Sequence, residues 1–194
     1  MYALTYSTSG DDANSTPSYK NEQFYWNRIS CQLFVSQCIW AGFGGSNSQA
    51  DINNRKGMDT TGEYQWWSTE TLYNNPAYND AGSPEDQSWN SWIYCPRFKV
   101  YIDGVRSNPS ESGVVCETYD VPYNSNNLVG SSGLTQDDLV GAALLVKGSS
   151  GEHGHAVLLN NATGTTRSTV YFTAYNTCYK NIKLSLRYPS STSN

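Results

Sequence analysis

Residues 30–45 read SCQLFVSQCIWAGFGG, and the interpretation of the whole chain begins from this stretch. At the helical period, one face contains Cys31, Phe34, Val35, Cys38 and Gly42, whereas Gln32, Ser36 and Trp40 turn elsewhere. Ser30 is a suitable N-cap, and the glycines at the end supply a stop signal. We therefore expect a buried helix whose first turn carries Cys31.

The place of Cys31 in this helix favours its thiolate form. The first turn of a helix presents unpaired backbone N–H groups and the positive end of the helix dipole, and both stabilise a negative sulfur. The same amides are suited to a developing oxyanion. A nucleophilic Cys31 is one interpretation, and a small buried hydrophobic side chain is the other, because that is how most buried cysteines act.

Composition narrows the class of protein. The chain has 194 residues and a formal net charge of -5, and this length suits a single domain over residues 1–194. Its 12 Lys and Arg residues form no basic run, so we expect no nucleic-acid partner. No apolar run is long enough to cross a bilayer, so we expect no membrane insertion. A composition that is poor in charged residues and rich in Tyr and Trp favours a protein that acts outside the cell on sugar or peptide polymers.

The five cysteines stand at positions 31, 38, 95, 116 and 178. Cys31 and Cys38 are about 10 Å apart along one helix, too far for a disulfide. An odd count leaves at least one thiol unpaired, and Cys95–Cys116 is the disulfide that we expect. No CxxC motif occurs, so a zinc site has no support in the sequence. We also expect no cofactor.

A long polar insertion at about 45–87 separates the first helix from the next one. A loop of this length inside a compact domain is usually functional or disordered, and Trp66 and Trp67 either line a substrate groove or pin the loop to the body. Trp92 precedes a helix that we expect to start near Cys95, with Pro96 in its first turn, and to end before Gly104.

The pattern changes at Leu134, where helical periodicity gives way to short runs separated by turn residues. These runs cover residues 142–147, 155–160, 169–175 and 182–187. Apolar or alternating runs of this kind are typical of an antiparallel meander. Because the helices come first and the strands follow, the order favours the α+β class.

The chain has two histidines, His153 and His155. They share one side of a strand if that strand extends back to His153. His155 opens an apolar strand, whereas His153 sits in a turn and is expected to be more exposed. Glu152 with both histidines would suit a metal, but a third well-spaced ligand is lacking, and we predict no metal site.

The chain order Cys31, His155, Asn176 fits nucleophilic catalysis by a thiol. Such catalysis needs a thiolate, a base that takes and returns its proton, and a group that orients the imidazole. The amide of Asn176 is able to orient an imidazole, although an Asn at this place is equally an ordinary turn residue.

The stretch 27–45 resembles the bacterial amidase-domain family of papain-like cysteine hydrolases, which is related to the NlpC and CHAP domains. Members carry an Asp-Cys-Thr-Asn-Phe-Val-Ser-Gln-Cys type motif, and Phe34–Cys38 is the most specific part of the match. Further similar blocks lie at 91–92, 138–140 and 155–158. The resemblance implies a papain-like fold in which an N-terminal helix carrying the cysteine packs on a C-terminal antiparallel sheet. It also implies Cys31 as nucleophile and His155 as base.

The resemblance further implies a secreted or cell-wall-associated protein, and we expect its signal sequence to be absent from this chain. The predicted function is a monomeric cysteine amidase or peptidase that hydrolyses amide bonds in peptides or in peptidoglycan. Trp66, Trp67 and Trp92 are the residues expected to bind the substrate.

The alternative is a catalytically inactive module that binds cell wall or glycan on the same fold, with its groove lined by the same tryptophans. The chain departs from the family at three places, because Ser30 replaces an Asp, Asp137 replaces a Gly, and no His lies near Asn176. The first and the last of these departures favour the inactive module. Fold alone does not separate these two functions, because one fold hosts many activities.

Overall fold

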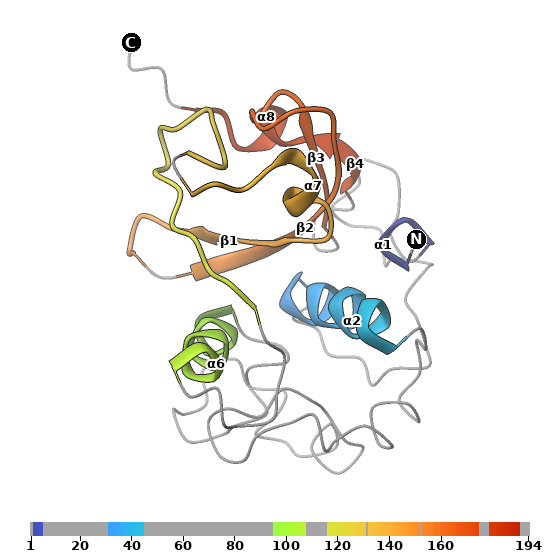
Figure 1. Cartoon of the computed structure of the whole chain (residues 1–194), viewed down its shortest axis with the longest axis vertical. Helices are drawn as coiled ribbons and strands as arrows, with labels where there is room; N and C mark the ends of the chain where they lie inside the picture. The colour runs from blue at the N-terminus through green and yellow to red at the C-terminus, as the bar shows by residue number, and fades with distance from the viewer. Residues whose placement is uncertain are drawn as a thin grey trace. The chain divides into compact units, whose positions relative to one another are not determined.

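The computed structural model describes residues 2–5, 31–44, 95–107, 116–130, 132–151, 153–174 and 179–190 (Figure 1). Asn176, the three tryptophans Trp66, Trp67 and Trp92, and the insertion at 45–87 lie outside these ranges. The chain divides into two compact units, one drawn from 1–20, 119–144 and 157–194 and the other from 21–118 and 145–156. The single-domain expectation stays a prediction.

Helices precede strands along the chain, as the sequence predicts. The elements are α1 (Tyr2–Thr5), α2 (Cys31–Gly44), α6 (Cys95–Ser107), α7 (Gln136–Leu139), β1 (Ala143–Lys147), β2 (His153–Ala162), β3 (Val170–Ala174), β4 (Tyr179–Lys183) and α8 (Leu184–Arg187). The four strands form one antiparallel sheet in the order β1-β2-β3-β4, which is a meander. The α+β class is therefore confirmed. None of the described helices is long and apolar enough to span a membrane.

The last strand is shorter than predicted. The run 182–187 was expected to be a strand throughout, but β4 ends at Lys183 and α8 follows it. Leu184 is fully buried whereas Leu186 is 75% exposed, so the alternating leucines do not form one buried face. The Tyr188 N–H donates to the Leu184 carbonyl at 2.8 Å, and this bond closes the helical turn instead.

The unit that contains β3, β4, α7 and α8 has its own hydrophobic core. Its buried members are Leu128, Leu139, Val157, Leu159, Ala162, Val170, Phe172, Ala174 and Leu184. The Phe172 ring is fully buried, with its centroid 5.5 Å from that of Tyr179 and 5.6 Å from that of Tyr188. This core holds the far half of β2, and β2 carries the histidines at its other end.

A buried arginine ties three segments of this unit together. The Arg167 guanidinium donates to the carbonyl oxygens of Ser125 at 2.7 Å, Tyr123 at 3.0 Å and Tyr188 at 3.0 Å. Burial lowers the pKa of Arg167, but an arginine stays charged at any physiological pH. Three carbonyl dipoles therefore satisfy a cation that is only 5% exposed.

Polar side chains also connect strands β2, β3 and β4. Thr173 Oγ1 donates to Asn160 Oδ1 at 2.9 Å, and Asn160 Nδ2 donates to Asn181 Oδ1 at 2.8 Å. The Asn181 N–H donates back to Thr173 Oγ1 at 3.1 Å. Asn181 has a φ of 54°, a left-handed conformation that Asn tolerates better than most residues.

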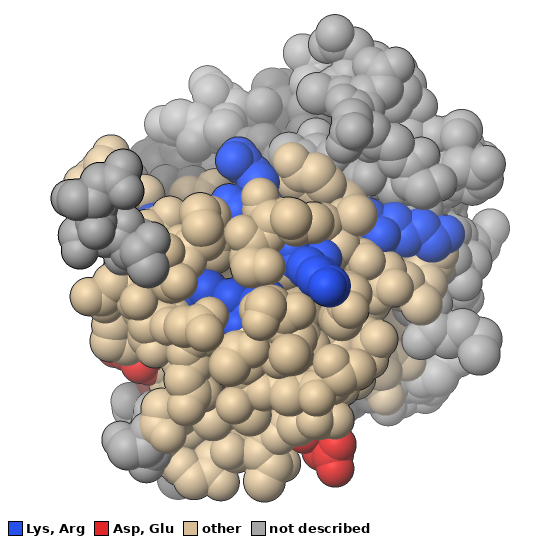
Figure 2. Space-filling model, turned by 90° about the horizontal axis from the view of Figure 1, so that it is seen from above, with Lys and Arg blue, Asp and Glu red and all other residues tan. Residues whose placement is uncertain are grey.

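The face in Figure 2 is mainly neutral. Lys and Arg side chains lie in separate groups among uncharged residues on this face, and acidic residues show only near its edge. This distribution agrees with a sequence in which charged residues make up 15%.

In the second unit, helix α2 is buried on more than one face. Residues 31–38 are all buried, including Gln32, Ser36 and Gln37, and Trp40 is buried too. The expectation of a buried helix is therefore confirmed, and Gln32, Ser36 and Trp40, which lie off the face of Cys31, are buried as well. Gln32 Nε2 donates to Ser36 Oγ at 3.0 Å, so one end of this buried amide is satisfied, whereas its Oε1 has no hydrogen-bond partner among the described residues.

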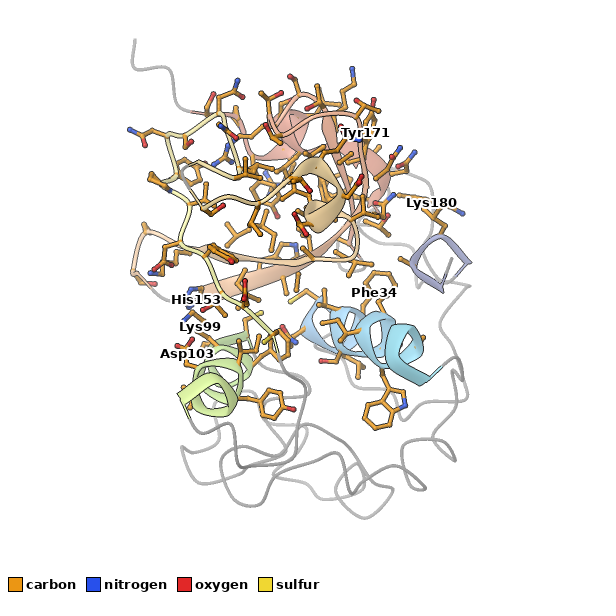
Figure 3. All side chains as sticks on the ribbon, viewed as in Figure 1. Phe34, Lys99, Asp103, His153, Tyr171 and Lys180 are labelled. Atoms are coloured by element: carbon orange, nitrogen blue, oxygen red, sulfur yellow. The ribbon has the colours of Figure 1, made fainter. Side chains whose placement is uncertain are left out.

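Helix α6 begins at Cys95, as predicted, but it continues through Gly104 to Ser107. The expected end before Gly104 is wrong, because one glycine weakens a helix without necessarily ending it. Lys99 and Asp103 form an ion pair one turn apart on α6 (Figure 3).

Candidate active site

Two thiols meet where two helices begin. Cys31 is the first residue of α2 and Cys95 is the first residue of α6. Their Sγ atoms lie 4.0 Å apart, although the residues are separated by 64 positions in sequence. Both side chains are buried, with 4% and 3% exposed. The start of a helix favours a thiolate, so two such starts converge on one sulfur pair.

Strand β2 brings an imidazole to the same place. The strand begins at His153, so its alternation puts His153 and His155 on one face, and His153 lies in the strand rather than in the expected turn. Both histidines are half-buried. The His155 side chain and the Ala156 backbone N–H both hydrogen-bond the Cys31 sulfur. The structure thus brings together Cys31 and His155, two of the three predicted catalytic residues, within one compact unit.

These neighbours hold the pKa of Cys31 well below that of an ordinary thiol. The hydrogen bond from the Cys95 thiol is the largest cause, burial opposes it, and the hydrogen bond and charge of His155 and the Ala156 N–H add to the lowering. The pKa of Cys95 is raised by its hydrogen bond to Cys31, by burial and by the charge of Cys31. The two shifts have opposite directions, and they favour Cys31 as the thiolate of the pair and Cys95 as the thiol that donates to it.

Cys38 provides an internal contrast on the same helix. It is buried, and burial raises its pKa well above the ordinary value, so it remains a thiol. The difference between Cys31 and Cys38 comes from Cys95, His155 and the Ala156 N–H, which lower the pKa of Cys31, whereas burial is the largest cause at Cys38.

Cys95 is the site residue that sequence reasoning missed. The predicted Cys95–Cys116 disulfide is wrong, because both residues are thiols. One signal was available: Cys95 stands directly before Pro96, and proline is favoured at the first helical position. Cys95 therefore occupies a helix start, as Cys31 does.

Other predicted site residues are not placed by the structure. Asn176, Trp66, Trp67, Trp92 and Glu152 all lie outside the described residues. Within the described part of the chain, no group of three His, Cys, Asp or Glu residues is arranged to hold a metal ion.

Comparisons with protein-family models, with curated proteins and with solved structures give no match to this chain. The chemistry of the site therefore rests on its own geometry. The Cys31 sulfur and the His155 imidazole beside it supply two of the parts that nucleophilic catalysis by a thiol requires, and Asn176, the group expected to orient the imidazole, lies outside the described residues.

Proposed function

We propose that the chain is a cysteine hydrolase that cleaves amide bonds in peptides or in peptidoglycan, on a papain-like fold. The observation that carries this proposal is the Cys31 sulfur, which receives hydrogen bonds from Cys95, His155 and the Ala156 N–H and has a lowered pKa. A thiol used only for packing has no need of this arrangement, and Cys38 on the same helix lacks it.

In the proposed reaction, the Cys31 thiolate attacks the carbonyl carbon of the substrate amide. The unpaired backbone N–H groups in the first turn of α2 are the donors that we assign to the oxyanion. His155 gives its proton to the departing amine, the C–N bond breaks, and Cys31 holds the acyl group as a thioester. His155 then takes a proton from water, which attacks the thioester and releases Cys31.

The remaining roles follow from the sequence. Asn176 orients the His155 imidazole, and Trp66, Trp67 and Trp92 bind the substrate chain. The protein acts as a monomer outside the cell or at the cell wall, without a cofactor.

The proposal is tested with purified peptidoglycan and with a peptide ester that releases a coloured leaving group. Amine release from the polymer and a burst of leaving group equal to the enzyme concentration are expected. Both disappear in Cys31→Ala and fall at least about 100-fold in His155→Ala, since a positioned base contributes about 10²–10⁴-fold. Cys38→Ala is the matched control and keeps both.

A different result would support the binding module. If the chain retains peptidoglycan on a column, releases no amine from it, gives no burst and binds equally well as Cys31→Ala, the hydrolase proposal is wrong.

A further inference from the structure

We propose that Cys31 and Cys95 form a peroxide-responsive site, in which oxidised Cys31 is captured by Cys95 as a reversible disulfide that switches the enzyme off. This inference rests on the proposed function, because it requires Cys31 to be the reactive thiolate. It adds a role for Cys95 that hydrolysis does not need.

Geometry supports the pairing of these two cysteines in particular. The Sγ atoms are 4.0 Å apart, and a disulfide requires about 2.05 Å, so the sulfurs must approach by about 2 Å. Rotation about the two Cα–Cβ bonds is the movement that we expect to close this gap. Both side chains are buried, which favours a small oxidant such as hydrogen peroxide over a bulky disulfide.

The two sulfurs are suited to different roles in the oxidation. The Cys31 thiolate attacks one peroxide oxygen, the O–O bond breaks, and hydroxide leaves and is protonated to water. Cys31 is now a sulfenic acid. The Cys95 sulfur attacks the Cys31 sulfur, the S–O bond breaks, and hydroxide leaves and takes the Cys95 proton to form a second water. The two thiols lose two electrons in total, and peroxide is reduced to water.

The lowered pKa of Cys31 and the raised pKa of Cys95 fit this division of roles. Cys31 is ionised and reacts first, whereas Cys95 keeps its proton until the sulfenic acid forms beside it. Without such a partner, a sulfenic acid exposed to excess peroxide advances to sulfinic acid, which ordinary thiols do not reduce.

The experiment treats the full chain with a small excess of hydrogen peroxide and maps its peptides without reduction. We expect a cross-link between the peptides of Cys31 and Cys95. Iodoacetamide labelling of Cys31 should fall at least about tenfold after peroxide and return after dithiothreitol, because only the thiolate is alkylated.

Variants separate the role of Cys95 from general oxidation. In Cys95→Ser and in Cys95→Ala, each checked for folding by circular dichroism, peroxide should convert Cys31 to sulfinic acid, and dithiothreitol should not restore labelling. Cys116→Ser is the matched control and should form the Cys31–Cys95 cross-link as the parent does.

Two results would overturn the inference in distinguishable ways. If Cys31 labels rapidly before peroxide but is oxidised to sulfinic acid in the parent without a cross-link to Cys95, the switch is wrong and the hydrolase proposal is untouched. If Cys31 labels as slowly as Cys38 before any peroxide is added, both proposals are wrong.

Discussion

Replacing Cys95 tests how far one thiol controls the ionisation of another. The Cys95 thiol donates the hydrogen bond that lowers the pKa of Cys31 most. A hydrogen bond to a charged group contributes about 1.5–3 kcal/mol, and about 1.4 kcal/mol corresponds to one pH unit in a titration. Cys95→Ala should therefore raise the titration midpoint of Cys31 by about one to two pH units.

Cys95→Ser supplies the matched comparison, because its hydroxyl is still able to donate to the Cys31 sulfur. We expect Cys95→Ser to move the midpoint by less than half as much as Cys95→Ala. His155 and the Ala156 N–H remain in both variants, so neither midpoint should reach that of an ordinary thiol.

The titration midpoint is measured from the ultraviolet absorbance of the thiolate. For each protein, the absorbance of the same protein carrying Cys31→Ser is subtracted, so that only the signal of Cys31 remains. Equal midpoints in the parent, Cys95→Ser and Cys95→Ala would refute the reasoning. So would a lower midpoint in Cys95→Ala, because it would mean that Cys95 destabilises the thiolate.

Three further predictions concern stability. Arg167→Met removes three hydrogen bonds to backbone carbonyls and should lower the free energy of unfolding in urea by about 2–4 kcal/mol, whereas exposed Arg187→Met should change it by less than about 1 kcal/mol. A small effect at Arg167 would contradict its role. Asn181 has a φ of 54°, so Asn181→Ala should lower the free energy of unfolding by about 1–2 kcal/mol, and Asn181→Gly should lower it by less. Equal decreases in the two variants would show that backbone conformation is unimportant at this position. Since the folded chain lowers the pKa of Cys31, the unfolded chain binds more protons from acid pH up to about 8.5, and stability due to Cys31 should rise with pH over that window. Denaturation of the parent and of Cys31→Ser at several pH values should show this slope only in the parent.

Local signals in the sequence predicted much of the architecture. The helical period of residues 31–44 predicted α2 and put Cys31 in its first turn, because helical periodicity is encoded within a few residues. Ser30, the expected N-cap, lies outside the described residues. Alternation and turn residues likewise predicted the antiparallel meander after Leu134, and the spacing of His153 and His155 predicted their common strand face.

Contacts between residues far apart in the sequence could not be predicted from such local patterns. The approach of Cys95 to Cys31 joins residues 64 positions apart, and no periodic pattern encodes it. The alternation at 182–187 also gave a wrong prediction of a strand. A helical turn forms there instead, with Leu184 buried and the Tyr188 N–H donating to the Leu184 carbonyl.

The most direct test of the account is the pH dependence of iodoacetamide labelling at Cys31, read by peptide mass spectrometry in the parent and in His155→Ala. Cys38, buried on the same helix, is the internal reference. The account predicts rapid labelling of Cys31 well below pH 8, although the pKa of an ordinary thiol is about 8.5, and a much slower reaction in His155→Ala. Labelling of Cys31 that is no faster than that of Cys38 and is indifferent to His155 would contradict the thiolate–imidazole pair.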